Sequence, residues 1–204
     1  MLEDILRESA RRHKHVCPRQ VLGARMSLYA AELLNLDLPR VDKRLIVISE
    51  TDGCTVDGII AATGCHVGGR TLRILDLGKV AATFIDSDSG TALRIAPAPV
   101  SRSLALDYAS SAPNKWQAML EAYQVMPAEE LLTCQPVELI ESLDEMISRP
   151  DRKTSCEVCG EEVINGREVL EKNIVLCRAC AGGSYYRSSA EPTAPGWLNR
   201  VRGM

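Results

Sequence analysis

The chain has 204 residues and a mass of 22.3 kDa, a length that accommodates one domain of ordinary size and a small appendage but not two full domains. Its apolar fraction of 46% and charged fraction of 25% exclude a disordered or fibrous chain, and a net charge of −3 gives no general attraction to nucleic acid. No uncharged stretch approaches the ~18 residues that a membrane helix needs, and charges among residues 1–12 are unlike an export signal, so we expect a cytoplasmic protein without a membrane span.

The apolar pattern of the first hundred residues predicts an α+β fold. Helical spacing predicts three helices, at residues 2–12, 18–34 and 55–63. Short apolar runs predict four strands, at residues 44–49, 71–76, 79–85 and 91–96. Pro18 suits the first turn of its helix, Thr51 or Asp52 is expected to cap the third helix, and Gly64 is expected to end it. A strand, a helix and then successive strands predict a mixed β-sheet core flanked by helices.

Helical spacing returns between Pro113 and Ile147. One helix is predicted around Trp116 and Tyr123, and shorter helices are predicted beyond Pro127 and Pro136, the first of them containing Leu131 and Leu132. The polar segment 148–155 is the best linker. The predicted organisation is therefore an α+β core over residues 1–150, a cysteine-rich module over 151–190 and an irregular tail over 191–204.

The C-terminal module has the spacing of a metal site. Cys156 and Cys159 form one C-x-x-C pair, Cys177 and Cys180 form another, and two such pairs close a tetrahedral Zn²⁺ site. A hairpin turning at Asn165-Gly166 and a short helix bearing the second pair, through residue 186, would resemble a treble-clef zinc finger. A closed four-cysteine site indicates a structural zinc, because it leaves no coordination position open for chemistry.

The charge of this module bears on its partners. Residues 151–204 carry eight Lys and Arg against seven Asp and Glu, which is not the basic stripe expected of a DNA-reading finger. Nucleic acid is therefore not an expected partner, and contact with another protein is easier to defend.

A second group of soft ligands lies near the N-terminus. His13, His15 and Cys17 alternate along HKHVCP, and Cys17 directly precedes the helix predicted from Pro18. Cys54 stands in the same way at the start of the helix over 55–63. The positive end of a helix dipole favours the thiolate, the form of cysteine that binds metals, so these residues predict an open site for Zn²⁺ or another transition metal. Cys65 and Cys134 are more simply interpreted as core residues.

These residues also carry a family likeness. The run HKHVCPRQVLGARM and the run ETDGCTVDGIIAATGCHVGGRTLRILDLGKVAATF contain His-x-His-x-Cys-Pro, Thr-Asp-x-Cys-x-x-Asp and Thr-Gly-Cys-x-x-Gly. Over most of residues 10–100 they resemble the formylmethanofuran dehydrogenase E-subunit family, although Lys14 and Arg19 stand where that family commonly has glycine. The resemblance implies an α+β domain whose metal site maps to the His13–Cys17 segment and to Cys54, with Cys65 as a neighbour.

The resemblance also implies partners. The family name indicates association with subunits of the molybdenum or tungsten oxidoreductase that reduces carbon dioxide onto methanofuran, and thus a role related to methanogenesis. The redox chemistry of that enzyme is attributed to its other subunits. If the chain oligomerises, a symmetric homodimer is the expected state.

Three hypotheses follow from the sequence. The first is a metal-binding protein with a structural zinc in the finger and an open core site formed by Cys17, Cys54 and either His13 or His15. The second is a thiol-redox or metal-dependent enzyme in which Cys17 and Cys54 act as a redox pair, or as nucleophiles with His15 as the base. The third is a zinc-finger adaptor or regulator, and the sequence does not decide whether the chain is an enzyme.

Overall fold

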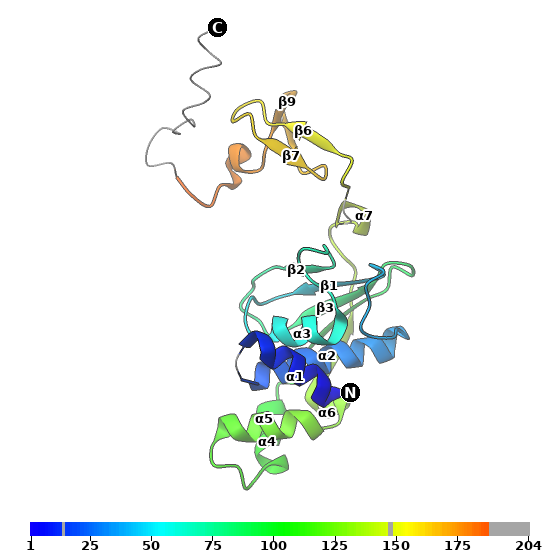
Figure 1. The fold of residues 1–204 in the computed structure, drawn as a ribbon, viewed down its shortest axis with the longest axis vertical. Coiled ribbons are helices and arrows are strands. Elements are labelled where there is room, and N and C mark those ends of the chain that lie inside the picture. The colour runs from blue at the N-terminus through cyan, green and yellow to red at the C-terminus, as the bar shows by residue number, and fades with distance from the viewer. Residues whose placement is uncertain (14, 147–148, 188–204) are drawn as a thin grey trace. The chain divides into compact units, whose positions relative to one another are not determined.

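The structure, a computed structural model, describes residues 1–13, 15–146 and 149–187, and gives no side-chain description for residues 12, 13, 144 and 145 (Figure 1). The predicted tail over 191–204 lies outside the described residues. Contacts divide the chain into two units, Met1–Ile147 and Ser148–Met204, here called the core and the C-terminal unit.

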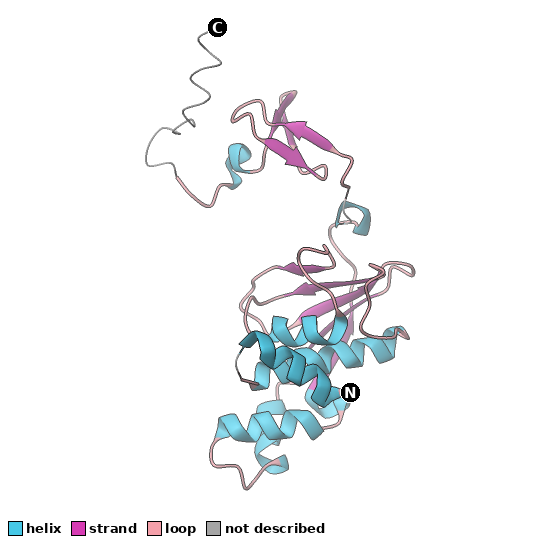
Figure 2. Ribbon diagram, in the orientation of Figure 1, coloured by secondary structure: helices cyan, strands magenta, loops and turns pink. Residues whose placement is uncertain are grey.

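The core combines helices with a β-sheet (Figure 2), and this sheet has five strands. Its helices are α1 (Leu2–His13), α2 (Pro18–Leu34), α3 (Thr55–Thr63), α4 (Ser101–Tyr108), α5 (Lys115–Val125), α6 (Ala128–Leu131) and α7 (Leu143–Met146). Its strands are β1 (Leu45–Ser49), β2 (Leu72–Ile74), β3 (Ala82–Asp86), β4 (Ala92–Pro97) and β5 (Leu132–Pro136). The strand order is β2-β1-β3-β4-β5, in which β1 and β2 are parallel and the other pairs antiparallel. The predicted α+β class with a mixed sheet is confirmed.

Both faces of the sheet are covered at β1, which explains why every residue of this strand is buried. Val47 pairs with Phe84 of β3, and both belong to the larger core, which includes residues of α2 and α3. The alternate residues Ile46 and Ile48 point to the opposite face, where they pack with Met146 of α7. Because neither face meets water, the strand reads as a continuous apolar run.

The chain after α5 differs from the prediction. Leu132 does not continue a helix: α6 ends at Leu131, and β5 pairs antiparallel with β4, where Cys134 is opposite Ile95. Between β5 and α7 the chain is irregular. Val137 and Leu139 of this segment pack on the face that contains Ile46, whereas Ile140 is exposed. The spacing of the apolar residues after Pro127 did not distinguish the two structures, because either a helix or a strand can turn these side chains toward the core. Helix α4 was not predicted.

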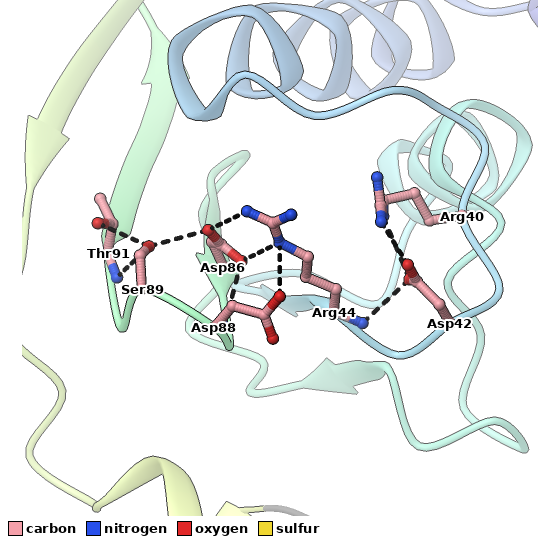
Figure 3. Close-up of polar contacts among 7 residues, drawn as sticks. All are labelled: Arg40, Asp42, Arg44, Asp86, Asp88, Ser89 and Thr91. Carbon is pink, nitrogen blue, oxygen red and sulfur yellow. Dashed lines mark hydrogen bonds and ion pairs between the residues drawn. The ribbon is translucent and has the colours of Figure 1, made fainter.

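A buried carboxylate ties the start of β1 to the β3–β4 turn (Figure 3). Arg44 donates to Asp86 through Nε at 2.7 Å and through Nη2 at 2.9 Å, and its Nε lies 3.2 Å from Asp88. Ser89 also donates to Asp86. The hydrogen bonds from Arg44, with smaller contributions from Ser89 and the backbone, hold the pKa of Asp86 well below its usual range. On the other side of Arg44, Asp42 pairs with Arg40.

The C-terminal unit contains two small antiparallel ribbons. Its strands are β6 (Lys153–Ser155), β7 (Glu162–Ile164), β8 (Val169–Glu171) and β9 (Ile174–Leu176), paired β6 with β7 and β8 with β9. Strand β6 lies inside the polar segment that was predicted to be a linker.

The turns of this unit correct one prediction. A two-residue loop, Lys172-Asn173, joins β8 to β9, and both residues have the positive φ of a type I′ turn. Asn165 and Gly166 also have positive φ, but they do not connect paired strands, so the predicted hairpin at this position is wrong. Strand β7 pairs instead with β6, across the first cysteine pair.

Candidate metal sites

The crossing of α2 and α3 brings Cys17 and Cys54 together. A β-carbon at Gly23 would lie 2.1 Å from the carbonyl oxygen of Thr55, and a β-carbon at Gly58 would lie 2.1 Å from that of Gln20. Only glycine allows two helix backbones to approach so closely. Because these contacts join the first two turns of α2 to the first two turns of α3, the residues that precede both helices become neighbours.

Cys17 is held by a buried glutamine. Its backbone N–H donates to Gln20 Oε1 at 2.7 Å, and Gln20 Nε2 donates to Ser9 Oγ of α1 at 2.9 Å. Gln20 and Ser9 are fully buried, and Cys17 is 7% exposed. The glutamine thus satisfies an N–H group at the helix start and also fixes α1 beside it.

Cys54 precedes α3, but neither Thr51 nor Asp52 caps that helix as predicted. Its first turn is closed instead by Val56 N–H, which donates to Gly53 O at 2.9 Å. Burial raises the pKa of the Cys54 thiol, a hydrogen bond with Cys17 raises it further, and Arg19 lowers it. The expectation of a depressed thiol pKa at this helix start is therefore wrong for Cys54 without a metal, because desolvation outweighs the helix dipole.

Both thiols line a cavity of about 830 Å³, which is within the size range of small-molecule sites. Its other lining residues are Pro18, Arg19, Leu22, Gly78, Val80, Pro97, Ala98, Pro99, Ser101, Arg102, Trp116, Met119 and Tyr123. Sequence reasoning missed Arg102 because α4 was not predicted, and it assigned Trp116 and Tyr123 only to a core helix. Their positions depend on how α4 and α5 pack, for which no local pattern gives a signal.

The predicted third ligand is a histidine. His15 is exposed, and its ring nitrogens and the sulfurs of Cys17 and Cys54 do not all lie within 4.8 Å of one another. The side chain of His13 lies outside the described residues. The choice of histidine ligand therefore stays a prediction.

The two remaining core cysteines have different surroundings. Cys65 is 2% exposed, at the far end of α3, and its thiol donates to Leu45 O at 3.4 Å. Cys134 lies on β5, packed against the core and half-buried. Burial raises the pKa of both thiols, as expected for cysteines that serve as apolar side chains.

The C-terminal unit gathers its four cysteines into one cluster. The sulfurs of Cys156, Cys159, Cys177 and Cys180 all lie within 4.8 Å of one another, and no other such group of three or more His, Cys, Asp or Glu occurs in the described part of the chain. Gly160 has a φ of 77°, which lets the chain fold back after the first pair so that Cys156 N–H donates to Glu161 O. The second pair leads into the short helical turn Ala179–Gly183, which contains Cys180, and not into a helix through residue 186.

The chemistry of this cluster fits a cation. Backbone N–H groups of Cys159 and Cys177 lower the pKa of Cys156 to about 6, whereas a hydrogen bond with Cys177 raises the pKa of Cys180 to about 12. Four sulfurs this close cannot all ionise without a compensating positive charge. Four soft donors at one point are suited to Zn²⁺ and other thiophilic ions.

These features define an α+β protein with a pair of neighbouring thiols in its core, one buried and one half-buried, and a C-terminal four-cysteine cluster able to bind a metal ion. The model of the family described as "FmdE, Molybdenum formylmethanofuran dehydrogenase operon" matches residues 12–133. The chain therefore belongs to the FmdE family, as its motifs predicted, and the matched region contains both Cys17 and Cys54.

Two other proteins are similar to parts of the chain or to its fold. An 86-residue segment, 41% of the chain, is 37% identical to a probable S-adenosyl-L-methionine-binding protein of Archaeoglobus fulgidus and spans only 24% of that protein. The fold is similar to that of a tungsten formylmethanofuran dehydrogenase E-subunit (FmdE)-like protein from Syntrophus aciditrophicus, with a TM-score of 0.58 and 19% identity over 91% of this chain and 95% of the other. No helix in the described part of the chain is long and apolar enough to cross a membrane.

Proposed function

We propose that the chain is an accessory metalloprotein with a structural Zn²⁺ at the four C-terminal cysteines and a second metal ion, Zn²⁺ or another transition metal, at Cys17 and Cys54. The observation that carries the core site is the meeting of these two thiols at a helix crossing, beside a cavity. A third ligand from His13 or His15 would leave a coordination position open to the cavity.

The local chemistry supports thiol ligation in the core. Cys17 and Cys54 are in contact, so a cation there would replace a thiol–thiol hydrogen bond by two metal–sulfur bonds. His15 is only two residues before Cys17, in the segment that leads into α2. This short separation along the chain makes His15 a candidate for the imidazole ligand. What the metal supplies when bound is Lewis acidity at one open position.

Metal analysis of variants tests the core site. We expect the full chain to hold two metal equivalents after mild purification, and Cys17→Ser or Cys54→Ser to lose one of them. Cys134→Ser is the matched control, because it removes a half-buried thiol outside the cavity and should keep both. Alanine at His13 and at His15, tested separately, identifies the imidazole ligand. Two equivalents retained in both cysteine variants would refute the core site.

We infer that the partner is a molybdenum or tungsten oxidoreductase of the formylmethanofuran dehydrogenase type. Support comes from the family, which is described by the operon of that enzyme. Affinity purification from cells that express the enzyme should recover its subunits with this chain. The mass of the purified chain in analytical sedimentation tests whether it forms a homodimer. Failure to recover any subunit under conditions that keep the enzyme intact would count against the association.

A second candidate is dithiol redox chemistry, and the contact between Cys17 and Cys54 favours it. Oxidation would form one S–S bond and release two protons and two electrons to an external disulfide oxidant. Mild oxidation with glutathione disulfide, followed by peptide mapping, should then link these two cysteines. The raised pKa of the Cys54 thiol weighs against this second candidate, because a thiol protonated at neutral pH is a poor nucleophile, whereas a bound cation would itself favour the thiolate.

A further inference from the structure

Four helices begin at the cavity that contains Cys17 and Cys54. Its lining includes first-turn residues of α2 (Arg19), α4 (Ser101) and α5 (Trp116), and also Cys54, the residue directly before α3. The N-terminus of each helix carries a partial positive charge of about half an elementary charge. Four such ends around one cavity favour a negatively charged occupant.

Side-chain charge has the same sign. Arg19 and Arg102 line the cavity, and none of its lining residues is acidic, although the whole chain has a net charge of −3. Neither arginine pairs with a carboxylate in the described part of the chain. Tyr123, which is buried, lies beside Ser101 and Arg102. Two thiolates with a divalent cation are neutral as a group, so a metal at the cysteines leaves the arginine charge uncompensated.

A second large cavity has a different charge, so the positive lining of the Cys17–Cys54 cavity is not a general property of cavities in this chain. Its volume is about 600 Å³, and its lining includes Asp4, Glu32 and Asp37 against one arginine, Arg25. That arginine is engaged, because it donates to the carbonyl oxygens of Tyr123 and Met126.

The cavity also offers apolar surface. Trp116 is 45% exposed although it lies on its wall, and Met119, one turn further along α5, lies beside it. Leu22 and Val80 contribute aliphatic surface. A tryptophan so exposed gains by contact with a planar or apolar ligand.

We propose that this cavity binds a small organic anion, with its carboxylate or phosphate group between Arg19 and Arg102 and its apolar body against Trp116 and Met119. The inference deepens the proposed function, because it names the class of ligand that lies beside the core metal, and it rests on that function only for the metal. A guanidinium and helix N–H groups recognise both kinds of anion, so the test separates them.

The test uses the fluorescence of Trp116. Trp197→Phe leaves Trp116 as the only tryptophan in the full chain. This protein is titrated with benzoate, phenyl phosphate and the uncharged benzyl alcohol, which share a ring and differ in charge. We expect a saturable change with at least one anion and a Kd about tenfold higher or more for benzyl alcohol. The tighter of the two anions identifies the preferred charged group.

Variants of the arginines complete the test. Arg19→Gln and Arg102→Gln should each raise the Kd of the preferred anion about tenfold, because each removes a charge-assisted hydrogen bond. Arg7→Gln, which changes an exposed arginine of α1 outside the cavity, should leave it unchanged. The proposal is overturned if neither anion gives a saturable change, if benzyl alcohol binds as tightly, or if the Arg19 and Arg102 variants bind like the parent.

Metal content measured on the same samples keeps the two proposals apart. If the metal at Cys17 and Cys54 is wrong, the cysteine variants keep their metal and the anion titration is unaffected. If the anion site is wrong, the arginine variants show no binding defect while the cysteine variants still lose one equivalent.

Discussion

Glu50 and Arg94 form a two-point ion pair over the end of the sheet: Arg94 donates to Glu50 from Nε at 2.5 Å and from Nη2 at 2.8 Å. Glu50 is 8% exposed and directly follows β1, four residues before Cys54. Its carbonyl oxygen accepts hydrogen bonds from Leu77 and Lys79, in the loop that brings Gly78 to the cavity. One residue thus holds two loops beside the thiols.

Breaking this pair should loosen the core measurably. Glu50→Gln leaves Arg94 without a charged partner, and we expect a loss of about 2 kcal/mol in the free energy of unfolding, measured by urea denaturation. Glu3→Gln is the matched control, because the Glu3–Arg7 pair is largely exposed and should change stability by less than about 0.5 kcal/mol. Equal effects of the two substitutions would mean that the Glu50–Arg94 pair contributes no more to the free energy of unfolding than an exposed pair does.

Acid should destabilise the core through Asp86. Its pKa is held below the unfolded value, so its ion pair with Arg44 contributes fully above about pH 4 and is lost as pH falls further. Asp86→Asn should therefore lower stability by about 2 kcal/mol at pH 7 and make the stability curve flatter below pH 4. Unfolding of both proteins between pH 3 and pH 7 measures the difference, and parallel curves would contradict the assignment.

Adding one methyl group at the crossing of α2 and α3 should strongly destabilise the core. In Gly58→Ala the new β-carbon would meet the Gln20 carbonyl at 2.1 Å, so α2 and α3 must separate. We expect a loss of about 3 kcal/mol or more, together with lower metal retention at Cys17 and Cys54. Gly53→Ala provides the control, because its β-carbon would be 3.5 Å from the nearest atom, Thr51 Oγ1. A stable Gly58→Ala protein with normal metal content would show that the crossing adapts.

Removal of metal should unfold the C-terminal unit alone. Over residues 149–187 its apolar cluster contains three buried residues, Cys156, Val163 and Leu176, which is too few to stabilise a fold without the ion. Chelator treatment, or Cys156→Ser, should open residues 153–187 to proteolysis while residues 1–146 stay resistant. Limited proteolysis with mass spectrometry reads out both units at once, and continued protection of the C-terminal unit would argue against a structural metal.

Much of the core was predictable because its signals are local. Pro18 at a helix start, Gly64 at a helix end and the apolar run of β1 each specify their element within a few residues, and α2 and α3 have the predicted bounds. The C-terminal cysteine cluster was also predictable, because C-x-x-C spacing lets a tight turn direct both sulfurs of a pair toward one point.

The errors concern elements whose form depends on distant partners. Leu132–Pro136 forms a strand because it can pair with the free edge of β4. No pattern within these five residues indicates that this edge is available. The cavity was missed for a similar reason: Arg19, Arg102 and Trp116 belong to three different helices and meet only once these are packed. Cys17 and Cys54 could be paired in advance because both precede a helix, but the cause of their contact is Gly23 and Gly58.

Met146 and its neighbours pack on the second face of the sheet, and this packing determines how short a stable fragment of the core can be. The family match ends at residue 133, within β5 and before the segment that shields Ile46, Ile48 and Ile85. A protein cut at that point would present these isoleucines to water and would be expected to associate through them. The stretch leading toward the C-terminal unit is therefore part of the core, and fragments intended for study should extend at least to residue 146.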